Sequence, residues 1–284
     1  MNLDHLRAFL EVAGTGNFNR AAERLHVTQS TISARIKALE EQLGQTLFAR
    51  NRSGAQLTVA GHRIRYHAEM AVRAWEQARQ EVSLPDSLSQ SIGLGVQVNL
   101  WERVVPRWLD WMRANAPETA VRVDADYSES MTRQVADGLL DLAILYVPRN
   151  LPGLLIDTLF EDSLILVATQ PRSVQQGWVE DYVFVDWGDE FRSRHALAFP
   201  HMQTPAITVG LSGIGLQYIL AHGGAGYIPE LTAEPLIAEG CLFRVEDAPV
   251  FSRPAYLVRA EASPNADVVA LALDGLRASL DASA

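Results

Sequence analysis

The chain has 284 residues, 48% of them apolar, which can bury the cores of two or three domains and exceeds the length of one small module. The formal net charge is −10, yet residues 1–65 hold nine Lys or Arg against five Asp or Glu. This distribution excludes a uniformly basic nucleic-acid-binding protein. Any contact with nucleic acid is expected at the amino-terminal end, because the acidic remainder repels phosphates.

The sequence also limits redox chemistry and location. Cys241 is the only cysteine, which excludes an intramolecular disulfide and a cysteine-rich metal site. No apolar run reaches the roughly 18 residues of a membrane span, and the amino terminus has no basic-then-apolar signal pattern. We therefore expect a cytoplasmic protein without a membrane partner.

The amino-terminal end predicts three short helices around one small core. Residues 3–13 carry apolar side chains at helical spacing, and residues 14–17 end this helix. Asn19 can cap a second helix over residues 20–25, and only a tight turn separates it from the third helix, residues 28–44. Two helices joined in this way are typical of a helix-turn-helix that binds duplex DNA.

The third helix has an apolar stripe and, opposite it, a polar face without an acid before Glu40. The stripe consists of Ile32, Ile36, Leu39 and Leu43. The amino-terminal end of a helix attracts phosphate, and amides and hydroxyls on the polar face can bond bases or phosphates. We predict DNA contacts from Thr28, Gln29, Ser30, Ser33 and Lys37. The alternatives are an ordinary amphipathic surface helix and, for Lys37, a solvated surface charge.

Two short apolar segments flank a Ser53-Gly54 turn after this helix and predict a two-stranded wing. The wing carries two basic side chains, Arg50 and Arg52. Because arginine binds phosphate readily, we expect both side chains to reach the DNA backbone beside the groove.

The segment NFNRAAERLHVTQSTISARIKALEEQLGQTLFARNRSGAQLTVAG, residues 17–61, resembles the winged helix-turn-helix of the LysR-type transcriptional regulators. The likeness runs from Leu3 to beyond Gly61. It implies base contacts by Gln29, Ser30 and Ser33. Many members of the family have an arginine where this chain has Ala34, which leaves the operator sequence open.

Residues 58–82 contain no proline and predict one long helix. The spacing of its apolar side chains alternates between four and three residues, as in the seam of a coiled coil, along Ile64, Ala68, Ala71, Trp75 and Ala78. We predict that this seam pairs with a second copy of the chain; by the resemblance it is the family's linker helix. The alternative is that the stripe packs on its own domain. The DNA-binding domain then covers residues 1–58, and the linker helix and hinge cover residues 59–90.

Residues 91–284 alternate strand and helix patterns, which predicts an α/β fold with a mostly parallel sheet. Strands are expected over residues 91–98, 121–127, 141–147, 154–160 and 163–169, and helices over residues 101–115, 131–138, 212–221 and 265–280. The motifs DGLLDLAIL, LFEDSLILVA and AHGGAGYIPE resemble the LysR effector domain, which is similar to the two-lobed periplasmic solute-binding proteins. This resemblance implies lobe I over about residues 91–163 and 259–284, and lobe II over about residues 164–258.

Ligands of open α/β sheets bind beyond the carboxyl ends of the strands, and two lobes place that crevice between them. The loops there predict effector contacts from Asn99, Trp101, Ser128, Glu129, Trp187, Phe191 and Arg194. These side chains suit a small polar or aromatic effector. Core packing is the alternative for Trp101 and Trp187. The motifs NLWE and DWGDEF also resemble the branch of the family that includes a repressor of flagellar genes.

Two features of the sequence could instead indicate a catalytic function. HGGAG at residues 222–226 resembles an esterase oxyanion loop, but GLSGIG at residues 210–215 lacks the nucleophile elbow, so the glycines are expected to end a helix. His195 and His201 lack a recognised zinc-ligand spacing. The sequence therefore predicts no enzyme activity, cofactor or metal.

These patterns together predict a ligand-responsive transcription factor that binds a pseudo-palindromic site in double-stranded promoter DNA. It is expected to act as a homodimer or, by the resemblance, as a homotetramer, with an unidentified small-molecule effector and RNA polymerase as further partners. The alternative is a DNA-binding repressor with no small-molecule effector.

Overall fold

The structure is a computed structural model that describes residues 2–51, 54–85, 87–175 and 178–281. The chain divides into two compact units, Met1–Asp86 and Ser87–Ala284. Within the described ranges, no helix is both long and apolar enough to cross a membrane.

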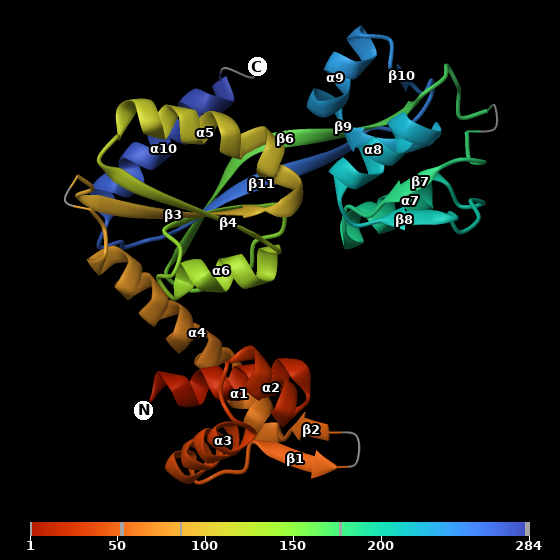
Figure 1. Ribbon diagram of the computed structural model, residues 1–284. Helices are drawn as coiled ribbons and strands as arrows, with labels where there is room; N and C mark the ends of the chain where they lie inside the picture. The colour runs from red at the N-terminus through yellow and green to blue at the C-terminus, as the bar shows by residue number, and fades with distance from the viewer. Residues whose placement is uncertain (1, 52–53, 86, 176–177, 282–284) are drawn as a thin grey trace. The chain divides into compact units, whose positions relative to one another are not determined.

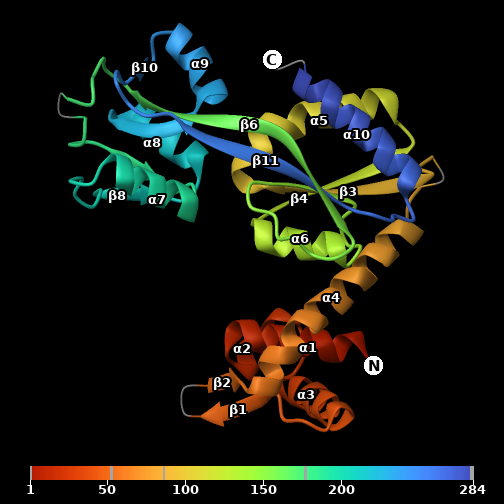
Figure 2. The ribbon, with the colours of Figure 1, turned by 180° about the vertical axis from the view of Figure 1, so that it is seen from behind.

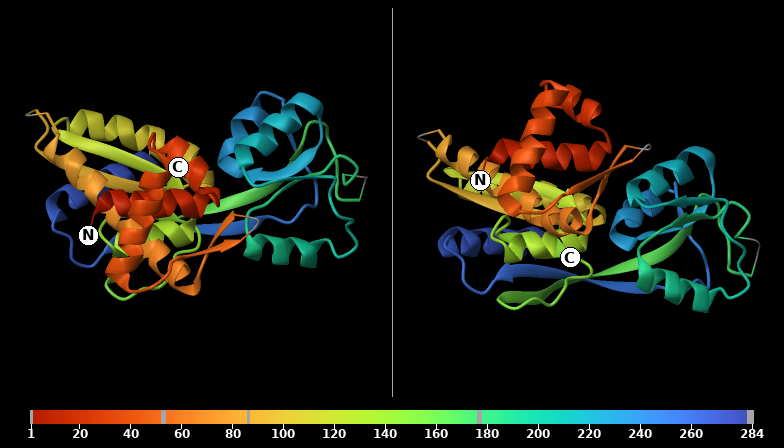
Figure 3. Two further views of the ribbon diagram at one scale, coloured as in Figure 1. Left: turned by 60° about the horizontal axis from the view of Figure 1, so that its bottom comes forward. Right: turned by 90° about the horizontal axis from the view of Figure 1, so that it is seen from below.

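The first unit contains the predicted helix-turn-helix and wing (Figure 1). Its elements are α1 (Leu3–Thr15), α2 (Phe18–Arg24), α3 (Gln29–Leu43), β1 (Phe48–Asn51), β2 (Gly54–Leu57) and α4 (Val59–Val82). Strands β1 and β2 pair antiparallel, and the hairpin projects from the helices (Figure 3). Ile32, Ile36 and Leu39 are buried in the shared core with Phe9, as the apolar stripe predicted.

Two details of this unit correct the sequence prediction. Helix α2 begins earlier than expected, because Asn17 rather than Asn19 is its cap: the Asn17 side-chain oxygen accepts from the backbone N–H of Asn19 (2.8 Å) and of Arg20 (3.2 Å). Leu43, the last member of the predicted stripe, is 43% exposed because it lies in the final turn of α3, just before the left-handed Gly44 ends the helix.

Helix α4 packs on its own unit over its first half. Ala68 is 1% exposed within the core formed by α1, α3 and the wing, and Ile64 and Ala71 pack against that core. For Ala68 the prediction of an intersubunit seam is therefore wrong, because its small side chain fills the unit's own interior. Farther along the helix, Trp75 is 52% exposed and Ala78 is also exposed.

The second unit has two lobes joined by two long antiparallel strands, β6 (Leu154–Ala168) and β11 (Phe251–Ala260) (Figures 1 and 2). The sequence predicted two separate strands over residues 154–160 and 163–169, which are one continuous strand. The two lobes have separate apolar cores, one around Trp108 and Ile144 and the other around Trp187 and Tyr227. The α/β prediction is confirmed, but the expectation of a mostly parallel sheet is wrong, because β6 and β11 pair antiparallel with each other and with all their other neighbours in the sheet.

Lobe I is a sheet covered on both faces. Strands β3 and β4 and strands β3 and β5 pair in parallel, and β11 pairs antiparallel with β5. Helices α5 and α10 cover one face and α6 covers the other (Figure 1). Its further elements are β3 (Gln90–Gln97), η1 (Val98–Leu100), α5 (Trp101–Asn115), β4 (Thr119–Asp126), α6 (Ser128–Ala136), β5 (Leu142–Leu145) and α10 (Ala266–Asp281).

Lobe II is built on the far half of β6, which pairs with β9 and β10, and on the parallel pair β7 and β8. Its elements are β7 (Val183–Val185), α7 (Asp189–Ala198), β8 (Ile207–Val209), α8 (Ser212–His222), β9 (Ala225–Pro229), α9 (Glu230–Ala238) and β10 (Phe243–Arg244). The sequence analysis did not predict helices α7 and α9. Their positions matter because α7 follows β7 and α9 follows β9, at the ends that face lobe I.

Candidate DNA-binding face and inter-lobe crevice

The amino-terminal end of α3 presents hydroxyls and an amide to solvent. Thr28 has an extended backbone and caps the helix, its Oγ1 accepting from the Thr31 N–H at 3.2 Å. Thr28 Oγ1 also lies 2.9 Å from Ser30 Oγ. Thr28, Gln29 and Ser30 are exposed, so their side chains and the uncommitted N–H groups of the first turn can approach a phosphate or a base edge.

Gln29 is held in place by its own helix. Its Nε2 donates to Ser33 Oγ at 2.9 Å, one turn along the same face. The contact restrains the amide before any DNA arrives, so less side-chain entropy remains to be lost on binding. Lys37 is 77% exposed in its side chain and lies 3.6 Å from Glu41, a surface ion pair that solvent screens strongly.

The wing is fixed to the helical core by backbone contacts. Glu40, the first acid on the outward side of α3, uses Oε1 to accept from the N–H groups of Leu47 (2.7 Å) and Phe48 (3.3 Å). The Ala55 N–H donates to the Gly16 carbonyl at 2.8 Å. Glu40 therefore positions the first strand of the wing instead of presenting a free negative charge. Arg52 and the side chain of Arg50, both predicted phosphate contacts, lie outside the described residues.

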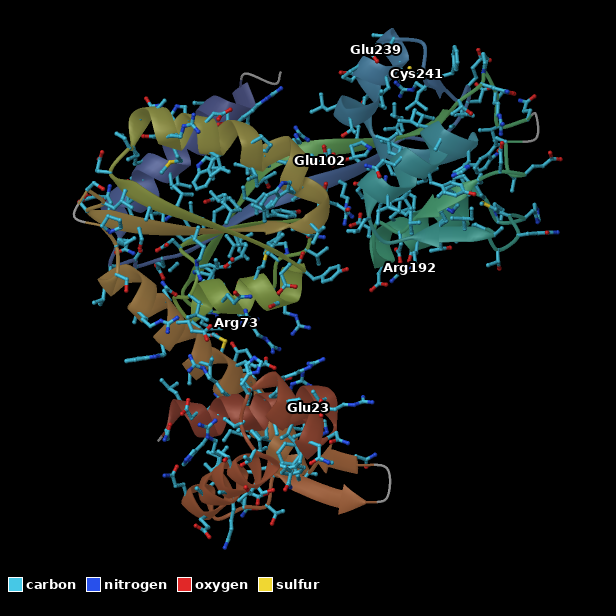
Figure 4. The ribbon with its side chains drawn as sticks, in the orientation of Figure 1. Glu23, Arg73, Glu102, Arg192, Glu239 and Cys241 are labelled. Atoms are coloured by element: carbon cyan, nitrogen blue, oxygen red, sulfur yellow. The ribbon has the colours of Figure 1, made fainter. Side chains whose placement is uncertain are left out.

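A cavity of about 450 Å³ lies between the two lobes. Asn99 and Glu102 line it from lobe I, Ser212 and Glu234 line it from lobe II, and Asp162 lines it from the crossing strand β6. Figure 4 shows Glu102 at the end of α5 nearest lobe II. The volume of the cavity suits a metabolite-sized ligand, and most of its lining residues are polar.

Asn99 joins the lobes directly. Its Oδ1 accepts from the backbone N–H of Ser212 at 3.2 Å and lies 3.4 Å from Ser212 Oγ. The residue before α8 is Leu211, which has no polar side chain, so Asn99 of lobe I serves as the cap of a lobe II helix. Of the predicted effector residues whose side chains the structure describes, only Asn99 lines this cavity.

A second cluster of polar groups lies at the carboxyl ends of the lobe I strands. Gln97 Oε1 accepts from Ser128 Oγ and from the Tyr146 N–H, the latter at 3.0 Å. Ser128 therefore lies at the predicted edge of the sheet, with its hydroxyl donating to the last residue of the strand β3. The side chain of Glu129, the next predicted residue, lies outside the described residues.

A buried carboxylate connects these groups to the crossing strands. Asp162 is 3% exposed and accepts from the Arg103 guanidinium and from Tyr146 Oη, the latter at 2.6 Å. Burial and the neighbouring Asp162 charge raise the pKa of Tyr146 well above its ordinary value, so this hydroxyl stays a donor. Arg253, opposite Asp162 in the β6–β11 register, places its guanidinium carbon 3.5 Å from the Tyr146 ring centroid.

Sequence reasoning missed these four residues, although one signal was present. Asp162 is an acid at the start of an otherwise apolar strand, SLILVA, where an unpaired charge would be costly to bury. The other three residues come from a helix, a strand end and a distant crossing strand. No local pattern brings them together.

Two predicted effector residues, Trp187 and Phe191, are corrected by the structure because they are buried. Trp187 is 2% exposed and donates its indole N–H to the Tyr227 carbonyl at 3.1 Å, and Phe191 is 4% exposed in the same core. Phe191 fills lobe II because α7 turns its apolar side inward, and Trp187, between β7 and α7, packs into the same core. Arg194 donates to the Ser252 carbonyl at 2.8 Å. Trp101 is 37% exposed at the start of α5 and does not line the described cavities.

The HGGAG segment and His195, which could have indicated catalysis, have structural roles. Gly223 ends α8 with φ 83°, so the HGGAG segment is a helix terminus, as expected. His195 lies in an aromatic cluster and approaches Tyr182 Oη at 3.0 Å. No group of three or more His, Cys, Asp or Glu side chains that could hold a metal ion occurs among the described residues.

Comparison with known families matches both units. The profile described as "Bacterial regulatory helix-turn-helix protein, lysR family" matches residues 3–62, and the "LysR substrate binding domain" matches residues 85–281. The chain is 31% identical over 280 residues to the HTH-type transcriptional regulator HdfR of Shigella boydii serotype 18. The alignment covers 98% of this chain and 97% of that protein.

Solved structures share the fold at lower identity. CbnR, described as a LysR family transcriptional regulator, aligns with a TM-score of 0.69 at 19% identity, covering 99% of each chain. Full-length CbnR with its target DNA aligns with a TM-score of 0.67 at 20% identity, covering 98% of this chain and 100% of that one. LysG of Corynebacterium glutamicum with bound effector Arg aligns with a TM-score of 0.56 at 17% identity, covering 99% of this chain and 98% of that one.

Proposed function

The chain belongs to the lysR family of bacterial regulatory helix-turn-helix proteins, and from this membership we propose how its residues carry out regulation. It is a transcriptional regulator with a helix-turn-helix domain and a substrate-binding domain. In our proposal, the amino-terminal end of α3 reads promoter DNA, and a small molecule bound between the lobes changes that activity. The exposed, acid-free start of α3 is the observation that carries the first part.

Base recognition is assigned to Gln29, Ser30 and Ser33. The Gln29 amide is restrained by Ser33, and a restrained amide can bond adenine through both its oxygen and its nitrogen. Thr28 and the free N–H groups of the first turn suit a phosphate. Lys37, Arg50 and Arg52 would add backbone contacts that hold the protein in register without reading sequence.

Effector binding is assigned to the crevice between the lobes. A polar cavity of about 450 Å³ that touches both lobes and the crossing strands supports this assignment. Asn99 and Ser128 remain in the proposed effector site. LysG, a relative in fold, is described with a bound effector, which is consistent with a ligand at this kind of domain.

Dimer formation is assigned to the exposed part of α4, around Trp75 and Ala78. A half-exposed tryptophan on a helix is a suitable anchor for a second copy. A pseudo-palindromic operator would follow from two-fold symmetry, and pairing of dimers would give a tetramer. We place this activity in the cytoplasm, where bacterial promoter DNA lies, with RNA polymerase as a further partner.

The test begins with operator sites selected from genomic fragments by the purified protein. Gln29→Ala should weaken binding to the selected site by about 1–3 kcal/mol and binding to random DNA much less. Gln42→Ala, an exposed glutamine near the other end of α3, is the matched control and should change neither. Equal losses on both DNAs would remove Gln29 from base recognition.

A second measurement separates a ligand-responsive regulator from a repressor without an effector. Operator titrations are repeated with a panel of metabolites at a constant salt concentration, because salt alone changes DNA affinity. A ligand that shifts operator affinity or transcription in the wild type, and not after Asn99→Leu, supports the crevice. The absence of any response across the panel in both assays would favour the repressor.

A further inference from the structure

Leu47, at the base of the wing, is bonded to both α3 and α4. Its backbone N–H donates to Glu40 Oε1 at 2.7 Å, and its carbonyl accepts from the Thr58 N–H at 2.9 Å and from Thr58 Oγ1 at 3.2 Å. Leu47 is 1% exposed, so these bonds are shielded from water. A Cβ at Gly61, in the first turn of α4, would lie 2.3 Å from the same carbonyl oxygen. The end of α3 and the start of α4 are therefore joined through one buried residue.

Thr58 completes this attachment from the α4 side. Its hydroxyl donates to the Thr46 carbonyl at 2.7 Å and accepts from the Gly61 N–H at 3.1 Å, so it caps α4 while it holds the segment that follows α3. Glu40, Leu47 and Thr58 together form the wing-base junction. This junction fixes the first turn of α4 to the last turn of α3. A single point of attachment, however, leaves the angle between two helices unrestrained.

A chain of ion pairs joins α3 to α4 a second time, through α1, which packs against both helices (Figure 2). Arg35 of α3 lies 3.1 Å from Asp4 of α1, Asp4 lies 3.8 Å from Arg7, and Arg7 lies 3.2 Å from Glu76 of α4. Glu76 lies about five helical turns beyond Thr58, so this ion-pair chain holds α4 far from the wing-base junction. Two attachments at different points of each helix restrain the angle between them.

The angle between α3 and α4 decides which DNA sites a dimer can occupy. Two copies that pair through the exposed part of α4 place their two α3 helices at a separation and a rotation set by that angle. Each added base pair rotates the second half-site by roughly 35° about the DNA axis, since one turn holds about 10.5 base pairs. A restrained angle therefore favours one half-site spacing, and an unrestrained angle accepts several.

We propose that the wing-base junction and the ion-pair chain together set the half-site spacing that the protein accepts in its operator. Glu40, Thr58 and Glu76 are then positioning residues, because they act through the orientation of α3 and not through contact with a base. The inference rests on the proposed function, since it requires a dimer assembled through α4. It adds a source of specificity that is separate from base recognition by Gln29.

The experiment measures the affinity of the full chain for synthetic duplexes that carry two selected half-sites at spacings differing by one base pair. Glu40→Ala and Thr58→Val remove bonds of the wing-base junction, whereas Glu40→Gln keeps an acceptor oxygen and Thr58→Ser keeps the hydroxyl. Glu76→Ala breaks the ion-pair chain at the surface of α4. Glu69→Ala is its matched control, because Glu69 pairs with Arg65 of the same helix at 3.0 Å.

We expect the wild type to prefer one spacing over those one or two base pairs away. Glu40→Ala and Thr58→Val should lower this preference about three- to tenfold, as expected for lost hydrogen bonds, and Glu76→Ala should lower it about two- to threefold, because its ion pair is partly exposed. Glu40→Gln, Thr58→Ser and Glu69→Ala should retain it. A smaller folded fraction cancels in this ratio of affinities, so a purely structural role would leave the preference unchanged.

An unchanged preference in Glu40→Ala and Thr58→Val would overturn the inference, and so would a wild-type dimer that binds all spacings equally. An equal loss in Glu40→Gln and Glu40→Ala would contradict the role of the bonds, and an unchanged preference in Glu76→Ala would contradict the second attachment. Sedimentation of the wild type with the duplex separates these results from failure of the proposed function. A dimer with any of these results rejects the spacing inference alone. A monomer on the DNA rejects the proposed assembly together with the inference, and no DNA binding by the wild type rejects the regulator.

Discussion

Acidification should destabilise lobe II through one buried histidine. His195 is 5% exposed and lies among aromatic rings, with centroid distances of 5.0 Å to Phe199, 5.4 Å to Phe191 and 5.8 Å to Tyr227. Burial lowers the pKa of His195 from 6.5 to about 4, because a charged imidazole loses its hydration in this environment. The folded protein therefore keeps the ring neutral at pH values where the unfolded chain protonates it.

The sign and size of the effect follow from these two pKa values. The unfolded chain binds the proton more tightly, so the stabilisation is fully present above pH 6.5 and is lost as the pH falls toward 4. Between pH 7 and pH 5 this linkage predicts a loss of about 2 kcal/mol in the free energy of unfolding. That loss is a substantial fraction of the stability of an ordinary domain.

Urea unfolding at pH 7 and pH 5 measures the effect, with the fluorescence of Trp178 and Trp187 reporting on lobe II. His195→Phe keeps a ring in the cluster and removes the titration. Between the two pH values this variant should therefore lose about 2 kcal/mol less of its free energy of unfolding than the wild type. His222→Gln, at the exposed end of α8, is the control and should behave as the wild type. Equal losses in the wild type and His195→Phe would refute the linkage.

Three further substitutions test packing, assembly and the contact between the lobes. A Cβ at Gly61 would lie 2.3 Å from a backbone oxygen, so Gly61→Ala should lower the free energy of unfolding of the first unit by about 1–3 kcal/mol in urea. Gly14→Ala is the control, because a Cβ there would meet open space, and equal effects of the two substitutions would contradict this packing. Trp75→Glu should yield monomers in sedimentation without loss of helical circular dichroism, because the ring is half exposed; persistent dimers would exclude this part of α4 from the interface. Asn99→Ala should cost about 0.5–2 kcal/mol, because the Ser212 N–H loses its cap; an unchanged melting temperature would show that the bond contributes nothing.

The elements of the first unit were predictable because their signals are local. Thr28 caps α3 as expected, since the cap and the N–H that donates to it are three residues apart. The same holds for α5 in the second unit, which has the predicted bounds, Trp101–Asn115, because its apolar period is strong. The stripe of α4 shows where such reasoning ends. A spacing of four and three residues fits packing against another subunit as well as packing within the same unit. Burial of Ala68 shows that the helix packs on its own unit at that position, and it says nothing of the positions farther along.

The crevice was less predictable because its geometry depends on pairings between distant strands. Sequence placed Ser128 and Asn99 at the carboxyl ends of strands correctly. It could not place Arg253 beside Tyr146, since these residues are far apart in the chain and meet only through the register of β11 with β5 and β6. Phe191 was assigned to a loop because α7 has no clear apolar period, and its ring fills the core instead.

The bond between the lobes sets how strongly a ligand must favour one arrangement in order to control them. The bond from the Ser212 N–H to Asn99 joins the lobes without a charge, and a neutral hydrogen bond contributes about 0.5–1.5 kcal/mol. A ligand can shift the lobes only by the difference in its affinity for their two arrangements. A difference larger than the contribution of the Asn99 bond would override it, and a coupling of about 1–3 kcal/mol would change operator affinity about 5- to 150-fold.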